Sequence, residues 1–184
     1  MNSSEKYLKE ALDKRKETNS FRTLKVKNES IDFSSNDYLG FSSTGLLHAK
    51  ILEFNQTQAK KITEGSTGSR LITGNSAIAE SLEGLIATYH NAESALLFNS
   101  GYDANVGLFS SVPQRGDTIF YDELVHASIR DGIRLSYANA YSFRHNDIAH
   151  LKELFKLAKG TVYIAVESVY SMDGDMAPLN DLVE

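Results

Sequence analysis

An alternation of short apolar runs and helical patterns between residues 94 and 166 limits the folds that this chain can adopt. Strands are predicted at 94–98, 118–121, 140–143 and 161–166, with helices at 103–110, 126–136 and 147–158. A strand, a helix and a second strand at this spacing form a right-handed crossover between parallel strands. The sequence therefore predicts an α/β fold with a mainly parallel sheet flanked by helices.

The residues before this alternation predict further helices. Helices are expected at 4–17, at 46–61 and from Ser76, a candidate N-cap, to Tyr89. Short extended pieces are expected at 24–27 and 30–33, joined by a turn at Asn28 and Glu29. We expect residues 1–45 to form an N-terminal arm. The last residues, from Pro178, resemble the first turn of a further helix, so truncation is the simplest expectation.

Composition excludes several classes of function. The 184 residues carry a net charge of -5, with scattered Lys and Arg, which argues against a nucleic-acid or anionic-membrane partner. Without cysteine, the chain can form no disulfide framework, thiolate zinc site or cysteine nucleophile. No apolar run approaches the roughly 18 residues of a membrane span. The N-terminus lacks the apolar region of a signal peptide, so a cytoplasmic location is expected.

Ser100, Gly101 and Tyr102 stand where a predicted strand leads into a helix. Glycine lets a backbone approach a ligand closely, and the start of a helix offers free N–H groups and a positive dipole end. This combination suits a phosphate group. A plain turn between strand and helix remains the alternative, because an open sheet uses few of its turns for ligands.

Two further polar elements follow predicted strands and point to the same edge of the sheet. His126 opens a helix, and its planar ring could stack on an aromatic cofactor or could simply cap the helix. Residues 167–175 follow the clearest strand, and a calcium loop, a phosphoryl-transfer aspartate and a tight turn at Gly174 are the alternatives there. The other histidines share no metal-ligand spacing, so no metal site is predicted and they are expected to be structural or exposed: His48, His90, His145 and His150.

Taken together, the motifs of this chain resemble those of the α-oxoamine synthase family of fold-type-I enzymes that use pyridoxal 5'-phosphate (PLP). The matching segments are 32–40, 65–75, 97–105, the D-x-x-x-H-A-S motif at 122–128, 143–147 and the specific E-x-V-[YF]-S-M-D-G-D-x-A-P-L signature at 167–179. The resemblance implies that residues 1–45 form an N-terminal arm and substrate-entry segment, and that residues 46–184 form an incomplete PLP-binding large domain of a PLP-dependent transferase. It also implies a homodimer, with residues 65–69 near the partner subunit's site.

The resemblance also implies roles for individual residues. Gly101 and Tyr102, beside Ser100, would bind the PLP phosphate through backbone N–H groups, and His126 would stack on the pyridine ring. Ser171 would bind near the phenolic oxygen of the cofactor, and Glu167 would support the pocket. Arg22 and Asn36 would contact the substrate.

The lysine that this family uses to hold PLP covalently is not found in the sequence, whose last lysine is Lys159. No catalytic residue is therefore expected in these 184 residues, and the chain alone is expected to be inactive.

The family's reaction condenses an amino acid with an acyl-CoA or acyl-carrier thioester and releases CO2. Residues 34–40 favour the biotin-pathway member, which uses L-alanine and a pimeloyl thioester. Glycine C-acetyltransferase, serine palmitoyltransferase and 5-aminolevulinate synthase are the alternatives within the family. A non-catalytic piece that binds PLP or phosphate, or only dimerises, is the alternative from another class, and an unrelated phosphate-binding α/β domain is the third.

Overall fold

The computed structural model describes residues 3–24, 26, 31–57 and 65–183. The chain divides into two compact units, Met1–Gly65 and Ser66–Glu184, and each is described by itself. The functional boundary predicted at residues 45 and 46 stays a prediction. In the part of the chain that the structure describes, no helix is long and apolar enough to cross a membrane.

The first unit contains two helices, α1 (Ser3–Glu17) and α2 (Leu46–Thr57). Helix α1 carries Glu5 in its first turn and three basic residues in its last, which complements the helix dipole. The helix predicted at 46–61 is confirmed as far as Thr57, and its remaining residues lie outside the described residues. The predicted extended pieces are only partly described, and Leu24, Val26 and Ile31 are exposed and belong to no strand. The turn predicted at residues 28 and 29 also lies outside the described residues.

The second unit is built on a three-stranded parallel sheet. The strands β1 (Thr118–Asp122), β2 (Asn139–Phe143) and β3 (Val162–Ala165) lie in the order β2-β1-β3. Phe120 of β1 pairs with Tyr141 on one side and Ile164 on the other. The predicted parallel sheet is thereby confirmed, with β1 at its centre.

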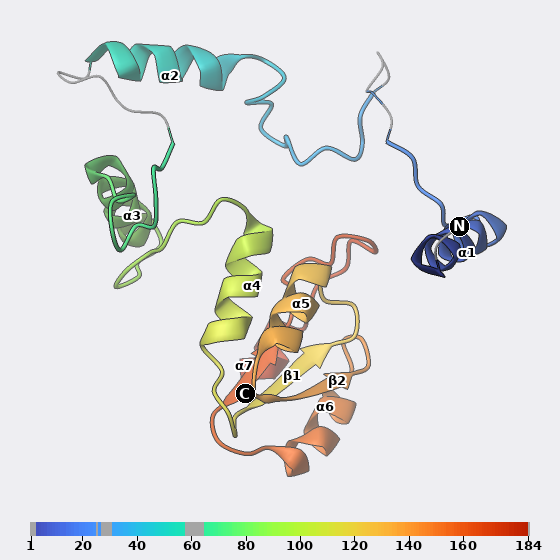
Figure 1. Cartoon of the computed structure of the whole chain (residues 1–184). Coiled ribbons are helices and arrows are strands. Elements are labelled where there is room, and N and C mark those ends of the chain that lie inside the picture. The colour runs from blue at the N-terminus through green and yellow to red at the C-terminus, as the bar shows by residue number, and fades with distance from the viewer. Residues whose placement is uncertain (1–2, 25, 27–30, 58–64, 184) are drawn as a thin grey trace. The chain divides into compact units, whose positions relative to one another are not determined.

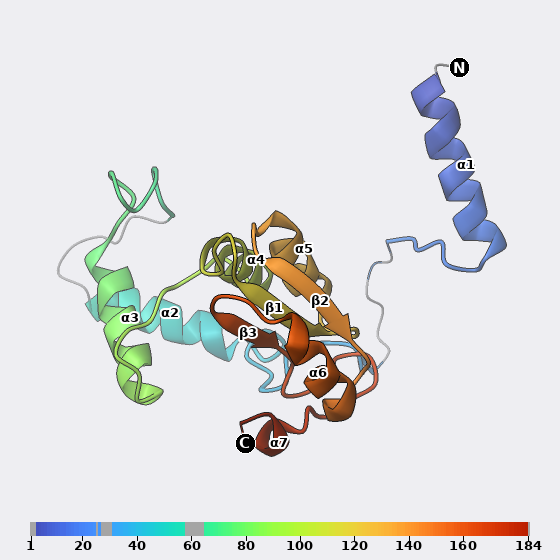
Figure 2. The same cartoon turned by 90° about the horizontal axis from the view of Figure 1, so that it is seen from below.

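Helices cover both faces of this sheet (Figures 1 and 2). Helices α4 (Gly101–Ser111) and α5 (Ala127–Leu135) lie on one face, whereas α6 (Ile148–Leu154) and the 3-10 turn η1 (Phe155–Leu157) lie on the other. Successive side chains of β1 point to opposite faces of the sheet and therefore pack against different helices. Ile119 belongs to the cluster with Ile129 and Ile133 of α5, and Phe120 to the cluster with Leu151 of α6. A short helix, α7 (Leu179–Val183), follows Pro178 as predicted.

The strand predicted at 94–98 is wrong. These residues belong to no strand, and they follow α3 (Ala77–Tyr89), whose predicted N-cap Ser76 is confirmed. The backbone N–H of Leu97 donates to the Glu83 carboxylate at 2.8 Å instead of to a neighbouring strand. The Glu83 side chain thus accepts the backbone N–H that a neighbouring strand would otherwise accept.

Glu83 also orders residues 65–75, the glycine-rich segment. Arg70 donates to both oxygens of Glu83, at 2.5 and 2.9 Å, and these bonds with the Leu97 N–H lower the pKa of Glu83 to about 2. The segment closes tightly, since a Cβ on Gly74 would stand 1.9 Å from the carbonyl oxygen of Gly68. The Arg70–Glu83 pair therefore connects the glycine-rich segment to the residues that lead into α4.

Candidate functional site

The turn before α4 has the geometry expected of a phosphate-binding turn. Ser100 is the N-cap, and its Oγ accepts the backbone N–H of Asp103 at 3.0 Å. The N–H groups of Gly101 and Tyr102 belong to the first turn, where no preceding turn of helix can accept them. A Cβ placed on Gly101 would meet nothing within 4 Å, so open space lies beside this residue at the start of the helix. The residues present therefore fit a phosphate group.

His126 begins α5, and two neighbours fix its ring. The backbone N–H of Ser128 donates to His126 Nδ1 at 3.2 Å, and Ser128 Oγ lies 2.7 Å from the same nitrogen. Asn105 of α4 donates to Ser128 Oγ at 3.0 Å, which leaves the serine hydroxyl free to donate its own proton to His126. A nitrogen that accepts these donors carries no hydrogen, so the ring is held in the Nε2–H form.

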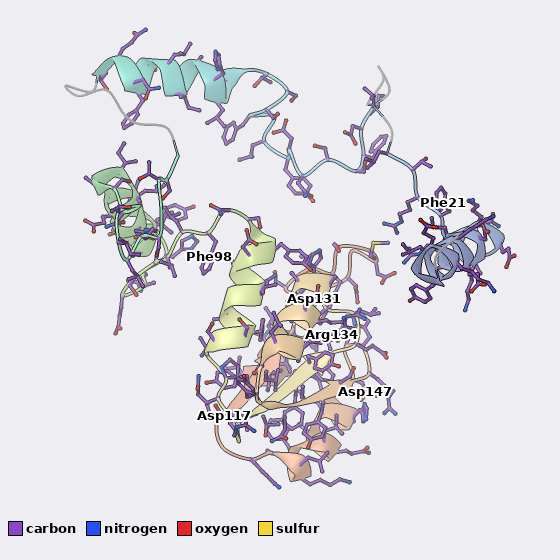
Figure 3. All side chains as sticks on the ribbon, in the orientation of Figure 1. Phe21, Phe98, Asp117, Asp131, Arg134 and Asp147 are labelled. Atoms are coloured by element: carbon purple, nitrogen blue, oxygen red, sulfur yellow. The ribbon has the colours of Figure 1, made fainter. Side chains whose placement is uncertain are left out.

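Tyr102 and Glu167 meet His126 from two other elements. The rings of Tyr102 and His126 stand edge to face, with centroids 6.2 Å apart. The Tyr102 hydroxyl donates to Asp131 of α5, labelled in Figure 3, and this hydrogen bond raises the pKa of Tyr102. The Glu167 carboxylate, beyond the end of β3, accepts the backbone N–H of His126. The structure thus brings together Tyr102, His126 and Glu167 at the carboxyl edge of the sheet.

The other predicted residues are placed less closely. Ser171 is exposed on the loop that begins with Glu167. Arg22 and Asn36 are exposed in the first unit, which is described by itself, so their substrate contacts stay predictions. The residue-specific cofactor roles of Ser100, Gly101, Tyr102, His126, Glu167 and Ser171 also stay predictions.

A second cluster at the same edge was missed by sequence reasoning. Asp122 is fully buried at the end of β1 and accepts backbone N–H groups from Leu124 and Asn146, both at 2.8 Å. His145 Nδ1 lies 2.9 Å from Asp122, and its Nε2 lies 2.7 Å from Asp175. His145 was expected to be structural or exposed, and it is partly buried between two carboxylates. Within the described residues, no group of three or more acidic or histidine side chains could hold a metal ion.

The charges of this cluster shift two pKa values in opposite directions. Burial would raise the pKa of Asp122, but the N–H groups of Asn146 and Leu124 and the His145 ring together lower it. Hydrogen bonds to Asp122 and then to Asp175 raise the pKa of His145 above its ordinary value of 6.5, against the effect of burial. The protonated ring and the ionised carboxylates therefore stabilise one another.

We expect the free energy of unfolding to be highest between the two titrations. The contribution of Asp122 to stability is present above its unfolded pKa of 3.8 and is lost as pH falls through its lower folded pKa. The folded pKa values of Glu83, Asp117 and Asp147 are also lowered, so their contributions are lost in the same direction. The contribution of His145 is complete below pH 6.5 and is lost as pH rises through its higher folded value. Urea unfolding across a pH series measures both limbs. The His145→Gln variant should lose the alkaline limb, and an unchanged limb would contradict this assignment.

The comparisons with known proteins agree with this geometry. Residues 28–184 match the family model described as aminotransferase class I and II, and the chain belongs to that family. An 8-amino-7-oxononanoate synthase from Emericella nidulans is 48% identical over 189 residues, which cover 96% of this chain and 46% of that protein. The chain spans about half the length of the curated relatives it matches.

Solved structures share the fold. A serine palmitoyltransferase from S. paucimobilis with bound PLP and myriocin is similar with a TM-score of 0.78 and 25% identity, over 100% of this chain and 51% of that one. An 8-amino-7-oxononanoate synthase from Francisella tularensis gives a TM-score of 0.63 and 30% identity, over 85% of this chain and 42% of that one. The resemblance and the fold class predicted from the motifs are confirmed.

Proposed function

We propose that this chain forms one half of the cofactor pocket of a PLP-dependent acyltransferase. The observation that carries the proposal is the meeting of Tyr102, His126 and Glu167 beside the open turn at Gly101. PLP, when bound, supplies an electron sink that stabilises negative charge on the α-carbon of an amino acid. The protein's part is to hold and orient this group.

Each residue has a task that its geometry supports. The N–H groups of Gly101 and Tyr102 would bind the phosphate at the positive end of α4. His126, neutral and fixed by Ser128, offers a planar face for stacking. Glu167 holds the start of α5 through the His126 N–H, and Ser171 would donate a hydrogen bond near the phenolic oxygen of PLP.

The described residues of the second unit supply no lysine to this pocket. The second unit contains three lysines, Lys152, Lys156 and Lys159. The backbone N–H of Lys159 donates to Thr118 Oγ1 at the first residue of β1, so this lysine lies at the opposite edge of the sheet. PLP would therefore bind to these residues without a covalent link, and the chain by itself would not complete the reaction.

The whole reaction we propose is the condensation of L-alanine with pimeloyl-CoA, or with a pimeloyl carrier protein, with loss of CO2, as in biotin synthesis. The 48% identity to an 8-amino-7-oxononanoate synthase supports this choice. Likeness to serine palmitoyltransferase supports another member of the family as the second candidate. In the full-length protein, CoA release from pimeloyl-CoA should require L-alanine, and release with glycine instead would refute the preference.

The family resemblance also supports a homodimer in the cytoplasm. Light scattering on the intact protein tests whether it is a dimer, and fractionation of the source cells tests whether it is cytoplasmic. A monomeric intact protein would contradict the expectation that residues 65–69 approach a partner subunit's site.

Gly101→Val tests the phosphate turn. We expect this change to weaken PLP binding about 10-fold or more, because a branched side chain would fill the open space beside the phosphate turn and a hydrogen bond to a charged group contributes about 1.5–3 kcal/mol. Isothermal titration of the chain with PLP measures the affinity. Gly84→Val is the matched control, since Gly84 is also a helical glycine with nothing within 4 Å of its Cβ. Equal affinities for Gly101→Val and the wild type would refute the phosphate assignment.

A further inference from the structure

We propose that His145 is a positioning residue that fastens the loop carrying Glu167 and Ser171 to the end of β1. The inference rests on the proposed function, because it gives the loop its importance as one wall of the cofactor pocket. The sequence resemblance assigned no task to His145. The geometry points to one, since this side chain lies after β2 and joins the end of β1 to the loop after β3.

Both ring nitrogens of His145 contact carboxylate oxygens. Nδ1 lies 2.9 Å from Asp122, at the end of β1, and Nε2 lies 2.7 Å from Asp175, in the loop after β3. An ionised carboxylate only accepts hydrogen bonds, so a ring that serves both must donate from both nitrogens. The protonated ring therefore bridges two acidic groups that would otherwise repel each other.

The neighbours of His145 strengthen the bridge. The side chain of Asn146 donates to Asp175 at 2.9 Å and to the carbonyl of Met176 at 3.2 Å, while its backbone N–H binds Asp122. The buried ring of Tyr170 stands edge to face with His145, with centroids 4.5 Å apart. Every contact joins the loop after β2 to the loop after β3 or to β1.

Other charged groups make the protonated ring favourable. The Glu123 carboxylate accepts the backbone N–H of His145 at 3.0 Å. Arg144, the adjacent cation, is paired with Asp147 at 2.7 Å. Of the carboxylates bound to His145, those of Asp122 and Asp175 contact the ring and that of Glu123 contacts the backbone, while the adjacent cation Arg144 is paired with Asp147.

The loop after β3 transmits this attachment to Ser171 as one folded turn. The backbone N–H of Tyr170 donates to the carbonyl of Asp175 at 2.9 Å, and that of Gly174 donates to the carbonyl of Tyr170 at 2.8 Å. Ser171 lies inside this closed turn. Glu167 anchors one end of the segment to His126, and Asp175 anchors the other end to His145. Loss of His145 would release one end while the other remained attached.

Asp175→Asn and His145→Gln test the bridge, with Asp173→Asn as the matched control. Asp173 is an exposed residue of the same turn, and its substitution removes the same charge. Hydrogen exchange is measured on the cofactor-free chain, and PLP affinity is measured by titration. We expect the amides of Tyr170 and Gly174 to exchange about 10-fold faster or more in the two bridge variants. We expect PLP affinity to fall about 10-fold in both, with little change in the control.

The direction of the change in PLP affinity distinguishes an effect of loop displacement from an effect of lost charge. PLP is an anion, so removing a negative charge from the protein would by itself strengthen binding, and weaker binding in Asp175→Asn but not in Asp173→Asn would indicate a displaced loop. Unchanged exchange in the bridge variants would overturn the attachment, and faster exchange with unchanged affinity would overturn the positioning role. If the wild-type chain does not bind PLP at all, the proposed function fails and the positioning role fails with it, while the exchange rates still report whether His145 holds the turn.

Discussion

Replacement of Phe120 by alanine should lower the free energy of unfolding of the second unit by about 3–5 kcal/mol, the usual loss for a buried aromatic residue. Phe120 is fully buried in the central strand. Its ring stacks on Phe155, with centroids 5.1 Å apart, and lies 5.9 Å from the ring of Tyr141. The cavity left by alanine would lie between the sheet and the α6 layer, where backbone on both sides limits collapse.

Urea unfolding followed by circular dichroism measures this loss. Leu135→Ala is the control, because Leu135 is 63% exposed at the end of α5 and its truncation should change stability by less than about 0.5 kcal/mol. A loss below about 1 kcal/mol for Phe120→Ala would mean that the α6 layer contributes little to the core.

Gly132→Ala is expected to destabilise the second unit by about 1–3 kcal/mol through overpacking. A Cβ at this position of α5 would stand 2.9 Å from the carbonyl oxygen of Asn105 and 2.9 Å from Cβ of Phe109, both on α4. The first of these atoms is backbone, so the two helices would have to move apart. Because Tyr102 of α4 meets His126 at the start of α5, PLP affinity should fall together with stability.

Gly84→Ala provides the opposite control. This glycine also lies in a helix, but its Cβ would be in open space, so alanine should stabilise α3 by up to about 1 kcal/mol. Parallel denaturation of the two variants separates helix propensity from packing. A stabilised Gly132→Ala would show that α4 and α5 are not held as closely as their contacts indicate.

Much of the second unit follows from local sequence. Ser76, Ser100 and Asp147 each cap a helix with a side-chain oxygen, and such caps can be read from residue type and spacing alone. The parallel sheet follows from β-rich runs separated by helices. The site at its carboxyl edge follows because successive strands of such a sheet end on the same side.

Two features could not be read in this way. The 94–98 segment has the composition of a strand, but strand formation also needs a paired neighbour, and Leu97 pairs with Glu83 instead. His145 lies far along the chain from both Asp122 and Asp175, so its local sequence does not predict the bridge. Only the alignment of β1 beside β2 and β3 brings the three together.

The sheet order also has a consequence for synthesis on the ribosome. Strand β1 lies between two strands that both follow it in the chain, so it leaves the exit tunnel before either neighbour does. At about 5–20 residues per second, the segment of roughly 40 residues that ends with β3 takes about 2–9 s to emerge. During that interval Ile119 and Phe120, fully buried in the finished protein, have an open strand edge beside them. We therefore expect the nascent chain to be most prone to aggregate between the emergence of β1 and that of β3, and synonymous codons that slow translation of this segment should increase aggregation.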